Sequence, residues 1–210
     1  MHSRRARGFS MIEAAVVMVI LGLLMTSALP NISSWLRNAK LRNQAESMLT
    51  GLQQARSEAV RRNRAVTFWM VNLPTASSMD NTCTTSSSGT SWVISLSDPS
   101  SHCGDAPSLT TDPKIVATRV GADGGTGVSI NGYQADASTA ASSVAFNGFG
   151  QVTGTGSLGV IVISYASSKT SDRPLHIEVS SSGQSRLCDP AVSDTTDPRH
   201  CIADGTSQYK

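Results

Sequence analysis

Two consecutive patterns of apolar residues predict that the chain begins with one long helix. From Phe9 to Leu29 nearly every side chain is apolar, and these 21 residues match the ~20 that an α-helix needs to cross a bilayer core. Further along, apolar residues recur at alternating steps of four and three, which is typical of an amphipathic helix with one buried face. This stripe comprises Leu41, Ala45, Met48, Leu52, Ala55 and Ala59. We expect it to lie against a sheet, with Gly51 weakening the helix locally by ~1 kcal/mol relative to Ala.

Beyond residue 64 the period changes from helical to extended. Runs of β-branched or aromatic residues alternate with clusters of Gly, Pro, Ser and Asp, which is typical of strands joined by turns. The runs cover residues 65–72, 91–97, 114–120, 126–130, 143–147, 158–166, 174–180 and 184–188. The stretch MDNTCTTSSSGTS and the tail after Cys188 are predicted to be exposed loops. This part of the chain is therefore expected to form an antiparallel β head.

Composition and charge fit one secreted domain of modest size behind an anchor. The 210 residues provide for a single core, and the aromatic content of 5% favours a loop-rich β domain. Residues 31–65 carry seven basic and two acidic side chains, or +5, whereas residues 66–210 carry seven basic and twelve acidic ones, or −5. The basic helix is expected to meet acidic neighbouring heads or anionic lipid headgroups, or else to be an ordinary solvated surface.

No pattern in the chain predicts catalysis, and we expect neither enzymatic activity nor a bound cofactor or metal. Residues 154–159 satisfy the dinucleotide-binding spacing of glycines, but a predicted strand follows where a phosphate-binding helix is required, so a glycine-rich turn is the better interpretation. The four histidines show no metal-ligand spacing. His176 alternates with Leu175 and Ile177 in a predicted strand, so its side chain is expected to point to solvent.

Glu13 places a carboxylate inside the apolar segment 9–29. A charge near the middle of a membrane segment costs at least ~2.5 kcal/mol, so it usually marks a function and a partner. A secretory signal peptide is the plain alternative, because a basic stretch at residues 4–7 precedes the apolar run and the small residues 26–28 would allow cleavage. A signal peptide has no use for a carboxylate, however, and the helical pattern continues past Pro30.

The sequence RGFSMIE, residues 7–13, resembles the leader junction of type IV pilins and type II secretion pseudopilins. In that family a membrane-embedded prepilin peptidase cuts after the glycine and methylates the new N-terminal aromatic residue. The resemblance implies that Gly8 precedes the cut, that Phe9 is the mature N-terminus, and that Glu13 neutralises the Phe9 amine during assembly. Pairing makes both charges tolerable in lipid. The resemblance also implies a helix kink at Pro30, because proline removes a helix hydrogen bond.

The segments VAFNGFGQVTG and RPLHIEVSSSGQSRLCDP resemble the ending of the GspH/FimT group of minor pilins and pseudopilins. FimU-like members have paired C-terminal cysteines and initiate type IV pili in a tip complex, whereas FimT-like members bind DNA for natural transformation through a G-R-x-R motif. At the corresponding positions here, Gln184 replaces the first arginine and Arg186 retains the second. The loss weakens a DNA contact, because affinity depends on the number of phosphates neutralised. Arg186, Gln184 and Arg199 are the candidate DNA contacts.

Four cysteines occur, and none forms a C-x-x-C pair, which argues against a zinc site. The oxidising periplasm that the resemblance implies favours disulfides instead. Pairing by proximity gives Cys83–Cys103 and Cys188–Cys201, although the sequence permits three connectivities. Each disulfide would stabilise the head by ~3 kcal/mol in the chain-entropy model.

Together these features predict an α+β pilin fold, with a long N-terminal helix packed on an antiparallel β-sheet head. Its expected parts are a leader peptide (1–8), a transmembrane and assembly half of the helix (9–29), an amphipathic half (30–64) and a periplasmic head (65–210) with a C-terminal disulfide loop. We expect a minor type IV pilin that is anchored in the inner membrane and then assembled near the pilus tip, with other pilins and the prepilin peptidase as partners. A type II secretion pseudopilin and a DNA-binding minor pilin stay open as alternatives.

Overall fold

The computed structural model describes residues 10–74, 78–121 and 127–202, without the side chains of residues 25–31. The chain divides into two compact units, Met1–Arg37 and Asn38–Lys210. The predicted leader and Phe9 lie outside the described residues.

The helix α1 (Met11–Arg62) begins in the first unit and ends in the second. Among the residues that the structure describes, no helix is both long and apolar enough to cross a membrane. The membrane segment predicted over residues 9–29 includes Phe9 and the side chains of residues 25–29, which lie outside the described residues. The same holds for the side chain of Pro30, where a kink is predicted.

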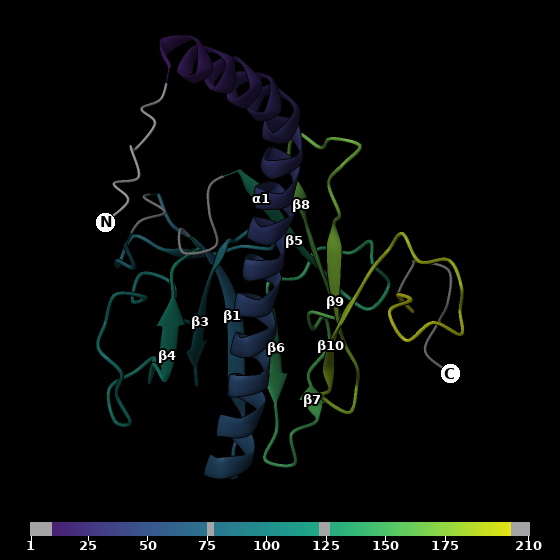
Figure 1. Cartoon of the computed structure of the whole chain (residues 1–210). Coiled ribbons are helices and arrows are strands. Elements are labelled where there is room, and N and C mark those ends of the chain that lie inside the picture. The colour runs from purple at the N-terminus through teal and green to yellow at the C-terminus, as the bar shows by residue number, and fades with distance from the viewer. Residues whose placement is uncertain (1–9, 75–77, 122–126, 203–210) are drawn as a thin grey trace, which may run out of the picture. The chain divides into compact units, whose positions relative to one another are not determined.

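The second unit consists of the C-terminal part of α1 and two antiparallel sheets (Figure 1). Over the described residues the first sheet has the order β4 (Ala117–Arg119), β3 (Ser91–Ser95), β1 (Val66–Asn72), β6 (Ser143–Phe146) and β7 (Val152–Thr153), and β2 (Thr84–Thr85) also pairs with β1. The second sheet has the order β10 (Ser185–Cys188), β9 (Leu175–Val179), β8 (Val160–Tyr165) and β5 (Val128–Tyr133).

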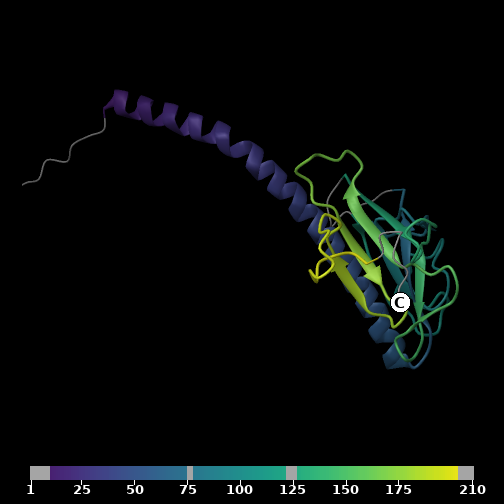
Figure 2. The same cartoon turned by 90° about the vertical axis from the view of Figure 1, so that its right-hand side faces the viewer.

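The predicted stripe of α1 forms the centre of the core. All six of its side chains are fully buried. They share one hydrophobic cluster with residues of the first sheet, such as Phe68 and Phe146, and residues of the second, such as Ile161 and Ile177. Figure 2 shows this part of α1 lying along the two sheets. Burial of each large apolar side chain stabilises the fold by about 1.5–3 kcal/mol, so the stripe holds both sheets to one helix.

The predicted strands are confirmed, with boundaries that differ by up to a few residues. The prediction that residues 79–91 form an exposed loop is wrong in part. Thr84–Thr85 pairs with β1, and Cys83 and Gly89 within the same stretch are buried. The two-residue strands β2 and β7 were not predicted, because their extended backbone comes from partner strands rather than from any alternation of their own.

Gly51 has a packing role in addition to its effect on helix propensity. A Cβ atom at this position would lie 2.8 Å from the Phe68 ring and 2.9 Å from the Trp92 ring. Both rings are buried, and the Trp92 indole N–H donates a hydrogen bond to the Ser47 hydroxyl at 3.2 Å. The absence of a side chain therefore lets two aromatic rings of the first sheet pack directly against the helix backbone.

We expect Gly51→Ala to destabilise the head by about 1 kcal/mol, because an overpacking cost of about 1–3 kcal/mol exceeds the ~1 kcal/mol gained in helix propensity. Thermal unfolding of the full chain in neutral detergent measures this change. Gly22→Ala is the control, since no atom lies within 4 Å of a Cβ there. Equal or higher stability of Gly51→Ala would show that Phe68 and Trp92 adjust freely.

Candidate functional site

The start of α1 has the sequence and geometry of a helix cap. The Ser10 hydroxyl accepts a hydrogen bond from the Ile12 N–H at 3.4 Å, and the Ser10 carbonyl accepts one from the Ala14 N–H at 3.1 Å. Glu13 lies in the first turn, where a carboxylate interacts favourably with the helix dipole. Ser10 and Glu13 have the S-x-x-E spacing of a capping box, but for the Glu13 carboxylate no hydrogen bond to the described residues is present. The local role of Glu13 beside the one that the resemblance implies is therefore its interaction with the helix dipole.

The first turns of α1 expose a continuous set of large apolar side chains. Each residue of this set has between 47% and 93% of its surface accessible to solvent. The set comprises Met11, Ile12, Val16, Val17, Met18, Val19, Ile20, Leu21, Leu23 and Leu24. Such a surface on a folded protein marks contact with a membrane or with another protein.

At the other end of the chain, Arg186 holds the C-terminal loop against the second sheet. Its guanidinium donates hydrogen bonds to the carbonyls of Pro198 at 3.2 Å and His200 at 2.9 Å. It also forms an ion pair with Glu178 at 2.6 Å, and this carboxylate is only 2% exposed. Arg186 and Glu178 lie directly opposite each other on β10 and β9. Arg186 therefore neutralises a buried charge and fixes the loop at the same time.

The other two candidate DNA contacts differ from Arg186 in their surroundings. Arg199 forms an ion pair with Asp197 at 2.7 Å, and the hydrogen bond from its side chain lowers the pKa of Asp197 to about 2. Gln184 is exposed, and its main-chain N–H donates a hydrogen bond to the Ser180 hydroxyl at 3.2 Å in the turn between β9 and β10. Both arginines thus have a carboxylate partner of their own, so neither adds an uncompensated positive charge to this surface.

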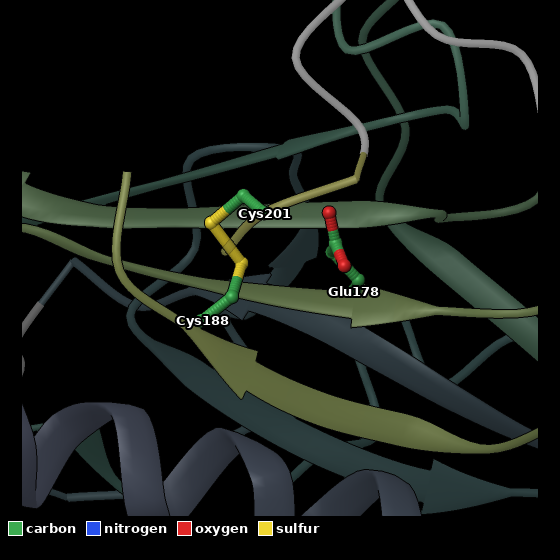
Figure 3. A group of neighbouring side chains, drawn as sticks. All are labelled: Glu178, Cys188 and Cys201. Atoms are coloured by element: carbon green, nitrogen blue, oxygen red, sulfur yellow. A yellow bond between two sulfur atoms is a disulfide. The ribbon is translucent and has the colours of Figure 1, made fainter. Parts of the chain in front are cut away.

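Both predicted disulfides are present. Cys83–Cys103 joins the loop before β2 to the segment after β3, and Cys188–Cys201 closes the C-terminal loop. Figure 3 shows Glu178 beside the second disulfide, and one ligand-type atom of each of Glu178, Cys188 and Cys201 lies within 4.8 Å of the others. The two sulfur atoms are bonded to each other, so they do not provide thiolate ligands. This group is a covalent closure of the loop and not a metal-binding set.

His176 does not point to solvent as predicted. His176 is on the same face of β9 as Glu178 and lies opposite Cys188 of β10. It is half-buried. Among the described residues its Nδ1 atom is buried and has no hydrogen-bond partner. Burial lowers the pKa of His176, and the negative charges of Glu178 and Asp189 oppose that shift. The alternation of the strand places His176 on the same side of β9 as Glu178, away from the core, but burial on that side is not part of the strand pattern.

Sequence reasoning did not identify Glu178 or Arg56 as structurally important polar residues. The alternation in β9 assigns Glu178 to the face away from the core, and only the return of the C-terminal loop buries it. Arg56 on α1 donates hydrogen bonds to the carbonyls of Gly150 at 2.9 Å and Ser182 at 3.5 Å. In the sequence, Arg56 is one polar residue of an amphipathic helix, and nothing there indicates that its side chain binds the turn between β6 and β7 and the turn between β9 and β10.

Comparison with known proteins matches most of the chain to one family. Residues 44–183 match the family described as type II transport protein GspH, and residues 3–29 match the prokaryotic N-terminal methylation motif. The chain belongs to the GspH family. No curated protein gives a significant match.

Two solved structures of the type IV minor pilin FimU from Pseudomonas aeruginosa are similar to this GspH-family chain. One is 15% identical with a TM-score of 0.43, and covers 73% of this chain and 97% of the other. The second is 16% identical with a TM-score of 0.44, and covers 74% of this chain and 92% of the other.

Membership of the GspH family agrees with the predicted pilin fold and with the prediction that the chain is a structural pilin or pseudopilin. The family consists of structural pilins and pseudopilins, and the observed helix on antiparallel sheets is the pilin-like α+β arrangement. Its methylation motif covers Gly8 and Phe9, which implies processing by a prepilin peptidase. The roles of individual residues stay predictions.

We expect Arg186→Ala to destabilise the head of this GspH-family protein by about 2 kcal/mol, because the buried Glu178 carboxylate loses its counterion. The effect is below the ~3–5 kcal/mol typical of a fully buried pair, since the Arg186 side chain is 37% exposed. Chemical denaturation measures the loss. Arg199→Ala is the matched control and should change stability little, because its ion pair is on the surface. The double variant Arg186→Ala/Glu178→Gln should recover part of the loss, and no recovery would contradict a charge-pairing role.

We also expect the head to lose stability as the pH falls below the ordinary His176 pKa of about 6.5. The unfolded chain then binds a proton at His176 that the folded chain resists, so stability declines between that value and the lower folded-state pKa. The melting temperature as a function of pH checks this. His176→Gln should flatten the curve in that window, and an unchanged slope would assign the pH dependence to other groups.

Proposed function

We propose that this GspH-family chain is a minor type IV pilin, a structural subunit that helps to initiate pilus assembly near the tip. Prepilin peptidase would cut after Gly8 and methylate Phe9. Residues 9–29 would hold the protein in the inner membrane, with the head in the periplasm, until they pack among the helices of other pilins. The observation that carries the proposal is that the large apolar side chains at the start of α1, within the segment matched by the methylation motif, are exposed.

The contrast between the two units supports this assignment. The stripe of α1 beyond Asn38 is fully buried by the sheets, whereas the large apolar side chains over residues 11–24 are exposed. A helix that is apolar on all sides needs surroundings as apolar as itself, and lipid or a bundle of similar helices provides them. A subunit that moves from a membrane into a fibre meets both environments in turn.

The C-terminal disulfide loop favours the pilus over the type II secretion system as the destination. FimU-like members of the GspH/FimT group share paired C-terminal cysteines, and Cys188–Cys201 has that position here. The DNA-binding alternative rests on Arg186, Gln184 and Arg199, and the ion pairs of both arginines with carboxylates do not favour it.

Substitutions of Glu13 test the assembly role against the capping role. Glutamine keeps the hydrogen-bonding capacity of a capping box but removes the charge, so Glu13→Gln should leave the membrane level normal and reduce recovery in sheared pili at least about tenfold. Glu13→Asp retains the charge and should assemble better than Glu13→Gln. Immunoblots of sheared pili and of membranes, in the natural host, measure both quantities.

Normal assembly of Glu13→Gln would show that Glu13 serves only as a helix cap. Gly8→Ala is the processing control, because it should leave the leader attached and the mass of the protein undiminished. Absence of the unmodified protein from sheared pili, with correct processing, would contradict the pilus assignment and favour a pseudopilin.

A further inference from the structure

At the β10 edge of the second sheet, the described residues leave Ser185 and Leu187 open to another strand. Hydrogen-bonded pairs alternate along β9 and β10, and the Ser180 N–H donates to the Gln184 carbonyl at 2.9 Å. The main-chain groups of Arg186 therefore point toward β9, and those of Ser185 and Leu187 point outward. Consistent with this alternation, the Val179 N–H, opposite Ser185, donates to Gly159 on the other side of β9.

The C-terminal loop closes this edge at its far end. The Asp189 N–H, which follows the same alternation outward, donates to the Arg199 carbonyl at 2.8 Å. Among the described residues no hydrogen bond is present to the outward N–H and carbonyl groups of Ser185 and Leu187. An edge of this kind accepts an additional strand through two N–H donors and two carbonyl acceptors.

The open edge borders a groove of about 870 Å³ whose other wall is α1. Gln53, Ser57 and Val60 contribute from the helix, and Ser185 and Arg186 from β10. Ser57 and Val60 are exposed, so the helix wall is accessible and combines a small polar side chain with an apolar one. An extended segment beside β10 would direct alternate side chains toward this wall.

The charge around the groove favours an acidic occupant. Arg56 donates to two carbonyls, and no carboxylate of the described residues forms an ion pair with it. Arg61 shares the Glu58 carboxylate with Arg62, and Arg186 has Glu178 to itself. The lining of the groove therefore contains three guanidinium groups and one carboxylate, or +2, whereas residues 66–210 of the chain carry −5.

We propose that the groove between α1 and β10 binds an extended, carboxylate-bearing segment of a neighbouring subunit, which adds as a strand to Ser185 and Leu187. The inference rests on the proposed function, because it requires a neighbouring subunit in a fibre. It names the surface by which the head, rather than the apolar helix, recognises that neighbour. Main-chain hydrogen bonds hold the segment, and the arginines select its charge.

A peptide with the required pattern tests the proposal on the full chain in neutral detergent. The probe is a labelled, end-blocked octapeptide in which valine alternates with aspartate. The control peptide is identical except that lysine replaces aspartate. Fluorescence anisotropy should show at least about tenfold tighter binding of the aspartate peptide. On binding, exchange of the Ser185 and Leu187 amide protons should slow, while that of Arg186, already paired with β9, should not change.

Two helix variants separate the groove from the rest of the surface. Ser57→Trp fills the groove and should weaken peptide binding at least about tenfold. Thr50→Trp is the matched control, because Thr50 and Ser57 are both exposed and each donates its hydroxyl hydrogen to a helix carbonyl, but Thr50 is outside the groove. Thr50→Trp should bind like the unmodified protein.

Several results would overturn the proposal. These are no binding, equal binding of both peptides, equal effects of the two tryptophan variants, or binding without protection of Ser185 and Leu187. Protection of both amides before peptide is added, with a dimer in solution, would assign the groove to a second copy of the chain. Because the measurement needs no assembled fibre, its failure is distinct from a failure of the Glu13 variants, which would contradict the pilin role itself.

Discussion

The buried stripe of α1 is the surface on which both sheets depend, since within the described residues the sheets share no strand. Ala45, Ala55 and Ala59 allow close approach of the strands, while the larger stripe residues fill the space between them. Gly51 extends this close approach to two aromatic rings. The position of β10 beside the helix, and with it the groove, follows from this one packed face.

Where local pattern determines structure, the sequence predicts it well. The stripe of α1 was predicted residue by residue, because a helix repeats its buried face at a fixed spacing regardless of what covers it. The longer strands follow from their own alternation in the same way. The pairs Cys83–Cys103 and Cys188–Cys201 followed from proximity alone, which works when loops are short. The strands β2 and β7 have no such pattern, because two residues cannot show a period.

The candidate site depends on contacts that a local pattern does not contain. The motif identifies Arg186 as a candidate DNA contact, but it does not show that this arginine is paired with the buried Glu178 and with two loop carbonyls. His176 was predicted to face solvent, but it is half-buried and its Nδ1 atom is buried. For Arg186, the path of the chain after Cys188 determines which carbonyls it meets, and no strand pattern contains that information. A resemblance to a motif identifies positions, while the partners of those positions come from tertiary structure.

The shortness of the open edge on β10 limits how the sheets of neighbouring molecules can join. Long unpaired edges allow sheets of neighbouring molecules to join edge to edge without limit. Here the turn at Gly183 and the hydrogen bond from Asp189 to Arg199 restrict the edge to Ser185 and Leu187. Two residues are too few to hold two sheets together by backbone bonds alone, so pairing requires the side chains of a matching partner. The C-terminal disulfide loop thereby shortens the length of the β10 edge that is available to another strand.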